Sequence, residues 1–117
     1  MHLESLRTYC LSFPGATESI KWGHHLAFCV GEKMFCVSTL EAEGQVSFKV
    51  PDEKFDETCA LPGVIPAPYS ARNKWVFVEH YDSLNDAQWR EFVAESYRLI
   101  RGKLSKKMQA ALPTSPQ

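Results

Sequence analysis

The chain has 117 residues, enough for one domain that buries about two thirds of the surface of its unfolded chain. Hydrophobic residues make up 44% and charged residues 23%, which is typical of a soluble globular domain. The formal net charge of -1 excludes a protein that coats nucleic acid with a uniformly basic surface. Any contact with a polyanion must therefore come from a local cluster of positive charge.

The N-terminus and the cysteines indicate a reducing compartment. Residues 1–7 lack the apolar stretch of a secretory signal, and no apolar run approaches the length of a membrane span. We therefore expect a cytoplasmic protein without membrane contact. The cysteines are then expected to be buried, reduced thiols and not disulfides: Cys10, Cys29, Cys36 and Cys59.

The first half of the chain predicts a helix followed by antiparallel strands. Apolar residues at spacings of three and four predict a helix over residues 3–13, which the Pro14-Gly15 pair ends. Alternating apolar residues predict strands over 26–30, 34–40 and 45–50, the first two joined by a tight turn at Gly31-Glu32-Lys33. Residues 19–22 are compatible with an additional short strand.

The second half predicts two further helices around a short strand. Pro51 opens a helix with acidic residues in its first turn, and the proline-rich stretch 61–68 forms a loop or an edge strand. Residues 75–79 form a strand. Ser83 and Asp86 resemble a capping box for a long amphipathic helix that Gly102 ends or kinks. Residues 106–112 add a further helical turn.

This order predicts an α+β fold, a two-layer sandwich with helices on one face of an antiparallel sheet. We expect a single domain over residues 1–112 and a frayed tail over 113–117. If Val46 and Val76 point toward the helices, then Lys49, Trp75 and Phe77 point outward. The uncovered face of the sheet then carries aromatic rings with a cation nearby.

Several segments also form a recognisable series along the chain: Leu11–Ala16, Trp22-Gly23, Lys33–Phe35, Ser47–Pro51, Asn73–Trp75, Ser96-Tyr97 and Leu104–Lys107. In order and spacing they resemble the MmcQ/YjbR family over nearly the whole chain. The resemblance implies a frataxin-like, or secretion-chaperone-like, fold of order α-β(3)-α-β(2)-α. It also implies DNA binding through a double wing of β-hairpins.

The main candidate for binding is a loop at the edge of the sheet. Arg72, Asn73 and Lys74 supply two cations and an amide, and Trp75 follows directly at the start of a strand. The cations suit phosphates and the indole suits a stacked base. The alternative is a solvated loop that leads into a tryptophan of the core.

Two other basic segments are candidates for the same interface. Lys33 lies at the tip of the first hairpin, and Lys49 lies on the outward face of its strand. Positive charge also gathers at the end of the last helix: Arg98, Arg101, Lys103, Lys106 and Lys107. Of these we take Arg101, Lys106 and Lys107 as candidate phosphate contacts. Stabilisation of the helix dipole is the alternative explanation of that cluster.

The sequence contains no recognised catalytic or metal-binding motif. It lacks a nucleophile elbow, a phosphate-binding glycine loop and a zinc-protease helix motif. The spacing of its histidines and cysteines fits no zinc site, and the acidic face of residues 52–57 is explained by the helix dipole. We expect neither an enzyme nor a cofactor or metal.

The sequence therefore predicts a DNA-binding module that makes mainly phosphate contacts, through the Arg72–Trp75 loop and the Lys33 hairpin tip. A protein- or peptide-binding adaptor that uses the uncovered sheet face, around Trp75 and Phe77, is the alternative. A small-molecule pocket between the sheet and the last helix stays open as a third possibility.

Overall fold

The computed structural model describes residues 1–40, 45–68 and 70–112. Its regular elements are, in chain order, α1 (Leu3–Leu11), β1 (Ala16–Lys21), β2 (His25–Val30), β3 (Lys33–Thr39), β4 (Val46–Lys49), α2 (Phe55–Cys59), β5 (Val64–Pro66), β6 (Trp75–Val78), α3 (Asp86–Arg101) and α4 (Lys106–Ala111). Short 3-10 helices lie at Asp52–Lys54, Ala71–Asn73 and Tyr81–Ser83. The expected tail over 113–117 lies outside the described residues.

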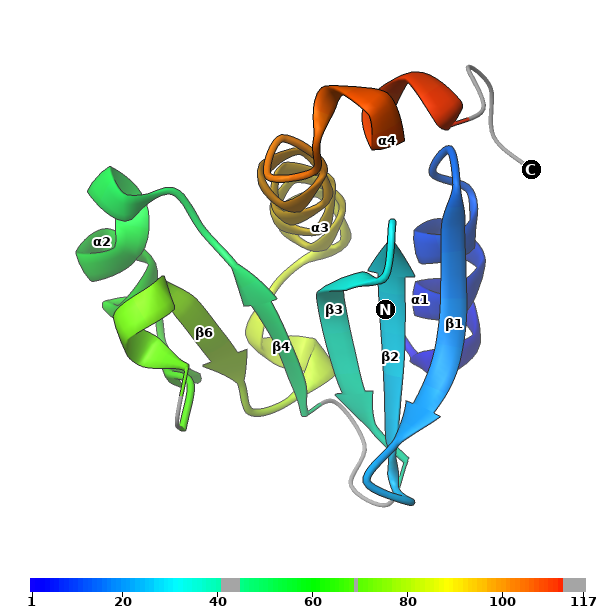
Figure 1. Cartoon of the computed structure of the whole chain (residues 1–117). Coiled ribbons are helices and arrows are strands. Elements are labelled where there is room, and N and C mark those ends of the chain that lie inside the picture. Colours follow the sequence, from blue (N-terminus) through cyan, green and yellow to red (C-terminus); the bar gives the residue numbers. More distant parts are fainter. Residues whose placement is uncertain (41–44, 69, 113–117) are drawn as a thin grey trace.

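The strands form one antiparallel sheet in the order β1-β2-β3-β4-β6-β5, with α1 and α3 on the same side of it (Figure 1). The predicted α+β sandwich is confirmed. The sheet contains one strand more than the α-β(3)-α-β(2)-α order, because residues 16–21 pair along β2. This edge strand was hard to predict because most of its side chains are polar and exposed, which leaves little apolar alternation.

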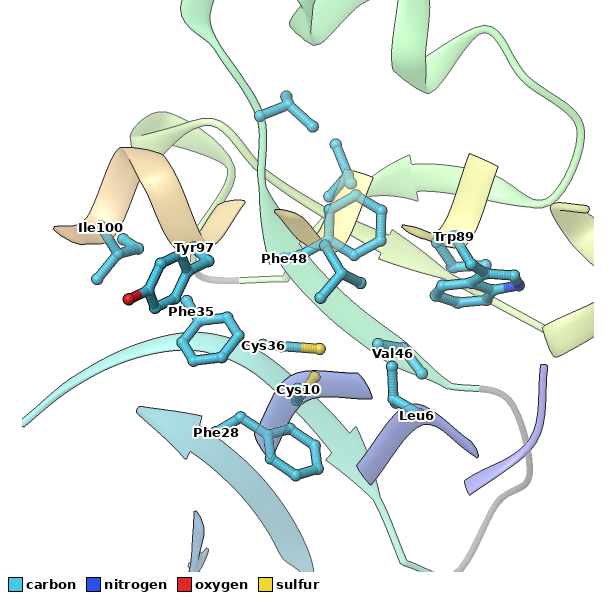
Figure 2. Close-up of a cluster of buried hydrophobic side chains, with 14 of the residues drawn as sticks. Leu6, Cys10, Phe28, Phe35, Cys36, Val46, Phe48, Trp89, Tyr97 and Ile100 are labelled. Atoms are coloured by element: carbon cyan, nitrogen blue, oxygen red, sulfur yellow. The ribbon is translucent and has the colours of Figure 1, made fainter. Parts of the chain in front are cut away.

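The core lies between the sheet and the two long helices (Figure 2). Leu6 and Cys10 of α1 and Trp89 of α3 are fully buried there against strand residues such as Phe28 and Phe48. As expected, Val46 and Val76 also face the helices. All four cysteines are free thiols, and Cys59 alone of them is not fully buried. Within the described ranges, no helix is long and apolar enough to cross a membrane.

The long helix begins later than its sequence pattern indicated. Asn85 is the N-cap of α3: its side chain accepts a hydrogen bond from the Gln88 backbone N–H, and the Gln88 side chain accepts one from the Asn85 N–H. The predicted cap at Ser83 is therefore wrong, since Ser83 ends a 3-10 helix. Asn85 completes the same kind of capping box closer to the helix. Gly102 is the C-cap, as expected.

A β-bulge in β3 places consecutive side chains on the same face. The register pairs Phe28 with Cys36 but Cys29 with Met34, so Phe35 is the extra residue. Phe35 and Cys36 both lie in the core, where the Phe35 ring contacts Tyr97 of α3. Met34 is left on the uncovered face of the sheet.

The serine hydroxyl of α3 enters the sheet next to this bulge. Extending the β3–β4 register by one step would place Phe35 opposite Lys49. Instead, the Lys49 backbone N–H donates to Ser96 Oγ at 2.9 Å, and the Ser96 hydroxyl donates to the Phe35 carbonyl at 2.6 Å. Ser96 thus replaces one direct bond of the ladder and holds β3 and β4 apart, and Figure 1 shows the two strands diverging in front of α3.

The β2–β3 hairpin is docked on the C-terminal segment. Gly31 and Glu32 both have positive φ, 53° and 71°, as a two-residue type I′ turn requires. A Cβ atom at Gly31 would lie 2.7 Å from Cδ1 of Leu104, so the turn packs directly beneath that buried leucine. The hairpin tip therefore lies against the segment between α3 and α4 and does not project freely.

We expect Ser96→Ala to lower the free energy of unfolding by about 2–4 kcal/mol. The change leaves the Lys49 N–H and the Phe35 carbonyl without their buried partner, and each such group costs about 1–3 kcal/mol. Urea denaturation measures the effect. Thr17→Ala, which removes an exposed hydroxyl from β1, is the matched control and should change stability by less than about 0.5 kcal/mol. Equal stability of the two variants would contradict the role of Ser96.

The docking of the hairpin tip predicts that two glycines differ in their tolerance of alanine. Gly23 and Gly31 both have positive φ, but a Cβ at Gly23 meets no atom within 4 Å. Both substitutions therefore carry backbone strain, and only Gly31→Ala also displaces Leu104. We expect Gly31→Ala to cost at least about 1 kcal/mol more than Gly23→Ala in thermal or urea unfolding. A larger cost at Gly23 would show that the tip is not tightly packed.

Candidate functional site

Two adjoining hollows lie on the face of the sheet that the helices leave uncovered. The first has a volume of about 610 Å³, and we call it the lysine hollow. The second, of about 550 Å³, is lined mainly by apolar side chains, and we call it the apolar hollow. Both are lined by Trp22, Met34 and Trp75, so they form one continuous depression, the open-face trough.

The lysine hollow concentrates positive charge on a chain with a net negative charge. Its charged lining consists of four lysines and one acid: Lys21, Lys33, Lys49, Lys103 and Glu32. By contrast, a cleft on the helix side, between α2 and α3, is lined by Glu57, Glu91 and Glu95 together with Lys54. The charged linings of these two clefts are therefore mainly of opposite sign. The net charge of -1 hides this difference.

The lysines come from four separate segments of the chain. Lys33 starts β3 and Lys103 follows α3, and they meet because the hairpin tip packs beneath Leu104. Lys49 ends β4, where Ser96 holds β3 and β4 apart. Lys21 ends β1. Burial raises the pKa of the Cys29 thiol, and the charge of Lys21 lies close enough to that thiol to oppose this effect.

Lys49 provides a positive charge at the base of the lysine hollow. Its residue is only 8% exposed, and its ammonium donates a hydrogen bond to the Asn73 carbonyl. Burial lowers the pKa of Lys49, and the nearby charges of Lys103 and Lys74 lower it further, while Asp52 opposes them. An anion bound between the ammonium groups of Lys49 and Lys103 would offset their mutual repulsion. The hollow is therefore suited to phosphate or carboxylate groups.

Trp22 combines a strained backbone with an exposed side chain, so it does not contribute to the stability of the fold. It lies in the β1–β2 turn with φ 53°, a left-handed conformation that costs a residue with a Cβ about 1–2 kcal/mol. Its side chain is 67% exposed, the most of the exposed large hydrophobic residues in the described chain. Its ring meets the His25 ring edge-on at 5.5 Å. This combination of strain and exposure is typical of functional sites.

The apolar hollow continues from the tryptophans toward β4 and β6. Val37 and Phe77 lie on its floor, and His24 and His25 stand at its β1–β2 end. In the described part of the chain, Nδ1 of His25 is a buried side-chain nitrogen without a hydrogen-bond partner. No three His, Cys, Asp or Glu residues among those described are grouped so that they could hold a metal ion. The hollow therefore offers flat apolar surfaces with a few polar groups.

The structure brings together part of the predicted interface. Lys33, Lys49, Asn73 and Trp75 all line the lysine hollow. Trp75 is half-buried: it packs against the core and also lines the trough, so it combines the two alternatives that the sequence left open.

The other predicted residues lie outside the hollow. Lys74 lies beside Trp75 in the chain, but its ammonium sits 5.0 Å above the Phe55 ring of α2. Arg72 is exposed on the neighbouring 3-10 helix. Arg101 ends α3, Lys106 and Lys107 begin α4, and none of the three lines the hollow. The contacts predicted for these residues stay predictions.

Sequence patterns missed three residues of the site. Trp22 was part of the family resemblance, in the Trp22-Gly23 pair, but was not predicted as a site residue, and Lys21 was not predicted either. Lys103 was one of five cations near the end of the last helix and was not selected among them. A usable signal was present in the β1–β2 turn, because a tryptophan next to glycine in a short hairpin loop has no core to enter. No sequence signal indicated that Lys103 meets the hairpin tip.

The comparisons with known proteins agree with this fold. The family model named YjbR matches residues 11–99, and the chain therefore belongs to the YjbR family, which confirms the resemblance. Among solved structures, it resembles the Deinococcus radiodurans protein DR2400, which carries the family-model domain DUF419. That match has a TM-score of 0.84 and 24% identity over 96% of this chain and 89% of the other, and it supports the fold alone. No similar sequence was found among curated proteins.

We expect Lys103→Ala to raise the pKa of Lys49. Burial and the charge of Lys103 both lower this pKa, and the substitution removes the second cause while leaving the first. NMR titration of the lysine side-chain signals measures the value in each variant. Lys54→Ala, on the helix side of the molecule, is the control and should leave it unchanged. An unchanged Lys49 pKa in Lys103→Ala would contradict the influence of the Lys103 charge on this ammonium group.

Proposed function

We propose that this protein is a non-catalytic, cytoplasmic DNA-binding module that makes mainly phosphate contacts in the open-face trough. One observation carries the proposal: four lysines from four segments converge on one hollow in a chain whose net charge is -1. Lysine and arginine side chains supply most of the affinity of proteins for nucleic acids, because phosphate contacts release bound counterions. A local cluster of this kind serves that purpose without a basic surface overall.

The predicted loop and hairpin tip frame this interface. Lys33 and Asn73 both line the lysine hollow, one in β3 and one in the 3-10 helix before β6. The Asn73 carbonyl anchors the ammonium of Lys49, so the loop is tied to the base of the hollow. Arg72 is exposed on that same loop, where it would add a further phosphate contact outside the hollow.

Arg101, Lys106 and Lys107 do not line the hollow, and they would contact phosphates outside it. Phosphate contacts position nucleic acid without selecting its sequence.

The state of the thiols supports a binding role over catalysis. Burial raises the pKa of Cys10, Cys29 and Cys59, which keeps these groups protonated and poorly nucleophilic at neutral pH. Tyr97, whose pKa is also raised by burial, donates its hydroxyl to the Pro14 carbonyl and so acts as a packing residue. We therefore assign no catalytic residue, cofactor or metal.

A protein- or peptide-binding adaptor is the second candidate. The apolar hollow favours it, since Val37, Phe77 and Trp75 form a surface that suits hydrophobic side chains. The lysine hollow would then require an acidic partner. A stoichiometric protein partner that no longer binds Trp75→Ala, together with no affinity for DNA, would favour the adaptor over the DNA-binding module.

The DNA-binding proposal predicts that lysines of the hollow control both affinity and its salt dependence. We expect Lys33→Ala/Lys103→Ala to weaken binding of a fluorescein-labelled DNA at least tenfold in 50 mM salt. The slope of log K against log salt concentration should become shallower by about 0.7–0.9 for each phosphate that the variant no longer neutralises. Fluorescence anisotropy at 50 and 200 mM salt measures both quantities.

Lys54→Ala removes one exposed lysine on the helix side and is the control, with affinity and slope expected to stay near those of the parent protein. Parent-like binding by the double variant would remove the hollow from the interface and return attention to Arg72 and Lys74. No saturable binding by the parent protein at 50 mM salt, at tens of micromolar protein, would reject the DNA-binding role itself.

A further inference from the structure

The tryptophans of the trough are not explained by phosphate binding. Phosphate contacts require only charge, but Trp22 occupies a strained turn position and exposes 67% of its surface. Trp75, which begins β6 on the same face of the sheet, is half-buried and lines the same depression. Two indole rings at the boundary between a cationic and an apolar hollow indicate a ligand that carries both anionic groups and flat apolar ones.

We propose that the open-face trough binds single-stranded nucleic acid, with an unpaired base against Trp22 and Trp75 and backbone phosphates in the lysine hollow. This inference rests on the proposed DNA-binding function and adds the form of the strand and the role of the rings. Combined cationic grooves and aromatic platforms are the usual means by which proteins hold single strands. Lys21 and Lys103 line the same hollow as both tryptophans, and so they would hold the phosphates next to the stacked base.

The shape of the trough favours a single strand over a duplex. In a duplex the flat faces of the bases are covered by their neighbours, so only the backbone and the groove edges are exposed. Trp75 and Phe77 are partly sunk into the sheet face, where an unstacked base reaches them and a base pair within a stack does not. The apolar hollow has a volume of about 550 Å³, within the usual range of about 300–1,000 Å³ for small-ligand sites.

The hairpin tip supplies a second argument against groove insertion. A wing that enters a groove must project from the body of the protein, but Gly31 packs beneath Leu104 and also lies near Met108. Insertion would require the tip to separate from both side chains. The docked tip instead places Lys33 at the wall of the lysine hollow, facing whatever occupies the trough.

The test separates the contribution of bases from that of phosphates. Binding is measured by fluorescence anisotropy at 50 mM salt with three labelled probes: a 12-nucleotide thymidine strand, an abasic strand of equal length, and a 12-base-pair duplex. The abasic strand keeps the phosphates and lacks the bases. We expect the thymidine strand to bind about 10- to 100-fold more tightly than the abasic strand, as one or two stacked bases provide. The duplex should bind less tightly than the thymidine strand, although it carries more phosphates.

Trp22→Asn is the decisive variant. Asparagine tolerates the left-handed conformation better than tryptophan does, so the variant should unfold at the same or a higher temperature than the parent protein. It should bind the thymidine strand less tightly than the parent protein does, so that the difference between the thymidine and abasic strands becomes smaller, with the affinity for the abasic strand unchanged. Trp22→Phe keeps a flat ring and should restore part of the difference. Ile20→Ala is the control. It shortens a second exposed apolar side chain, which lies in β1, and should bind like the parent protein.

Three outcomes would overturn the inference while leaving the DNA-binding function in place. These are equal affinity for the thymidine and abasic strands, tighter binding of the duplex than of the thymidine strand, and parent-like affinity of Trp22→Asn for the thymidine strand. An acidic peptide of equal net charge that binds more tightly than the thymidine strand would also overturn it, in favour of the adaptor. Failure of all three probes to bind at 50 mM salt would reject the DNA-binding function and this inference together.

Discussion

The arrangement of the open face depends on one hydroxyl group, that of Ser96. By accepting from the Lys49 N–H and donating to the Phe35 carbonyl, it satisfies both backbone groups at the point where β3 and β4 separate. An apolar side chain in its place would leave both groups unpaired or force the strands to close directly. The bulge at Phe35 and the splayed end of β4 are thus parts of one feature. Because the strands separate there, Lys49 of β4 lines the same hollow as Ile100 of α3 and Lys103, which follows α3.

A second contact completes the site from the opposite edge. Leu104 covers the Gly31 turn, and so the hairpin tip is fixed against the segment that follows α3. This contact brings Lys33 to Lys103, although the two lysines are far apart in the sequence. Burial lowers the pKa of Lys49, and the charge of Lys103 lowers it further, so keeping this ammonium group charged in the hollow costs stability. The strained and exposed Trp22 adds to that cost. The features that weaken the fold therefore coincide on one surface, and this coincidence distinguishes the trough from the acidic cleft between α2 and α3.

Much of the fold was predictable because its signals are local. The 3.6-residue periodicity of α3, the Gly31-Glu32 turn and the alternation of β4 each depend on a few neighbouring residues, and the structure contains all three. The predictions missed β1 as a full strand, since its polar edge position removes the alternation that marks a half-buried strand. They also placed the N-cap of α3 at Ser83 and not at Asn85. Ser83 with Asp86 and Asn85 with Gln88 are overlapping capping patterns, and only the backbone geometry decides between them.

The sequence by itself determined the α+β class and the family. It also indicated four residues of the candidate site, which are Lys33, Lys49, Asn73 and Trp75. Asn73 and Trp75 lie close together in the chain and were therefore recognised as one loop. Only the tertiary structure decided that Lys21, Trp22 and Lys103 join them and that Lys74 turns away to Phe55. The physical reason is that the residues of this site are far apart in the sequence, and only their distances in the folded protein bring them together. Here those distances are set by a buried hydroxyl between two strands and by a leucine packed on a hairpin turn, and neither contact has a signature in the local pattern of residues.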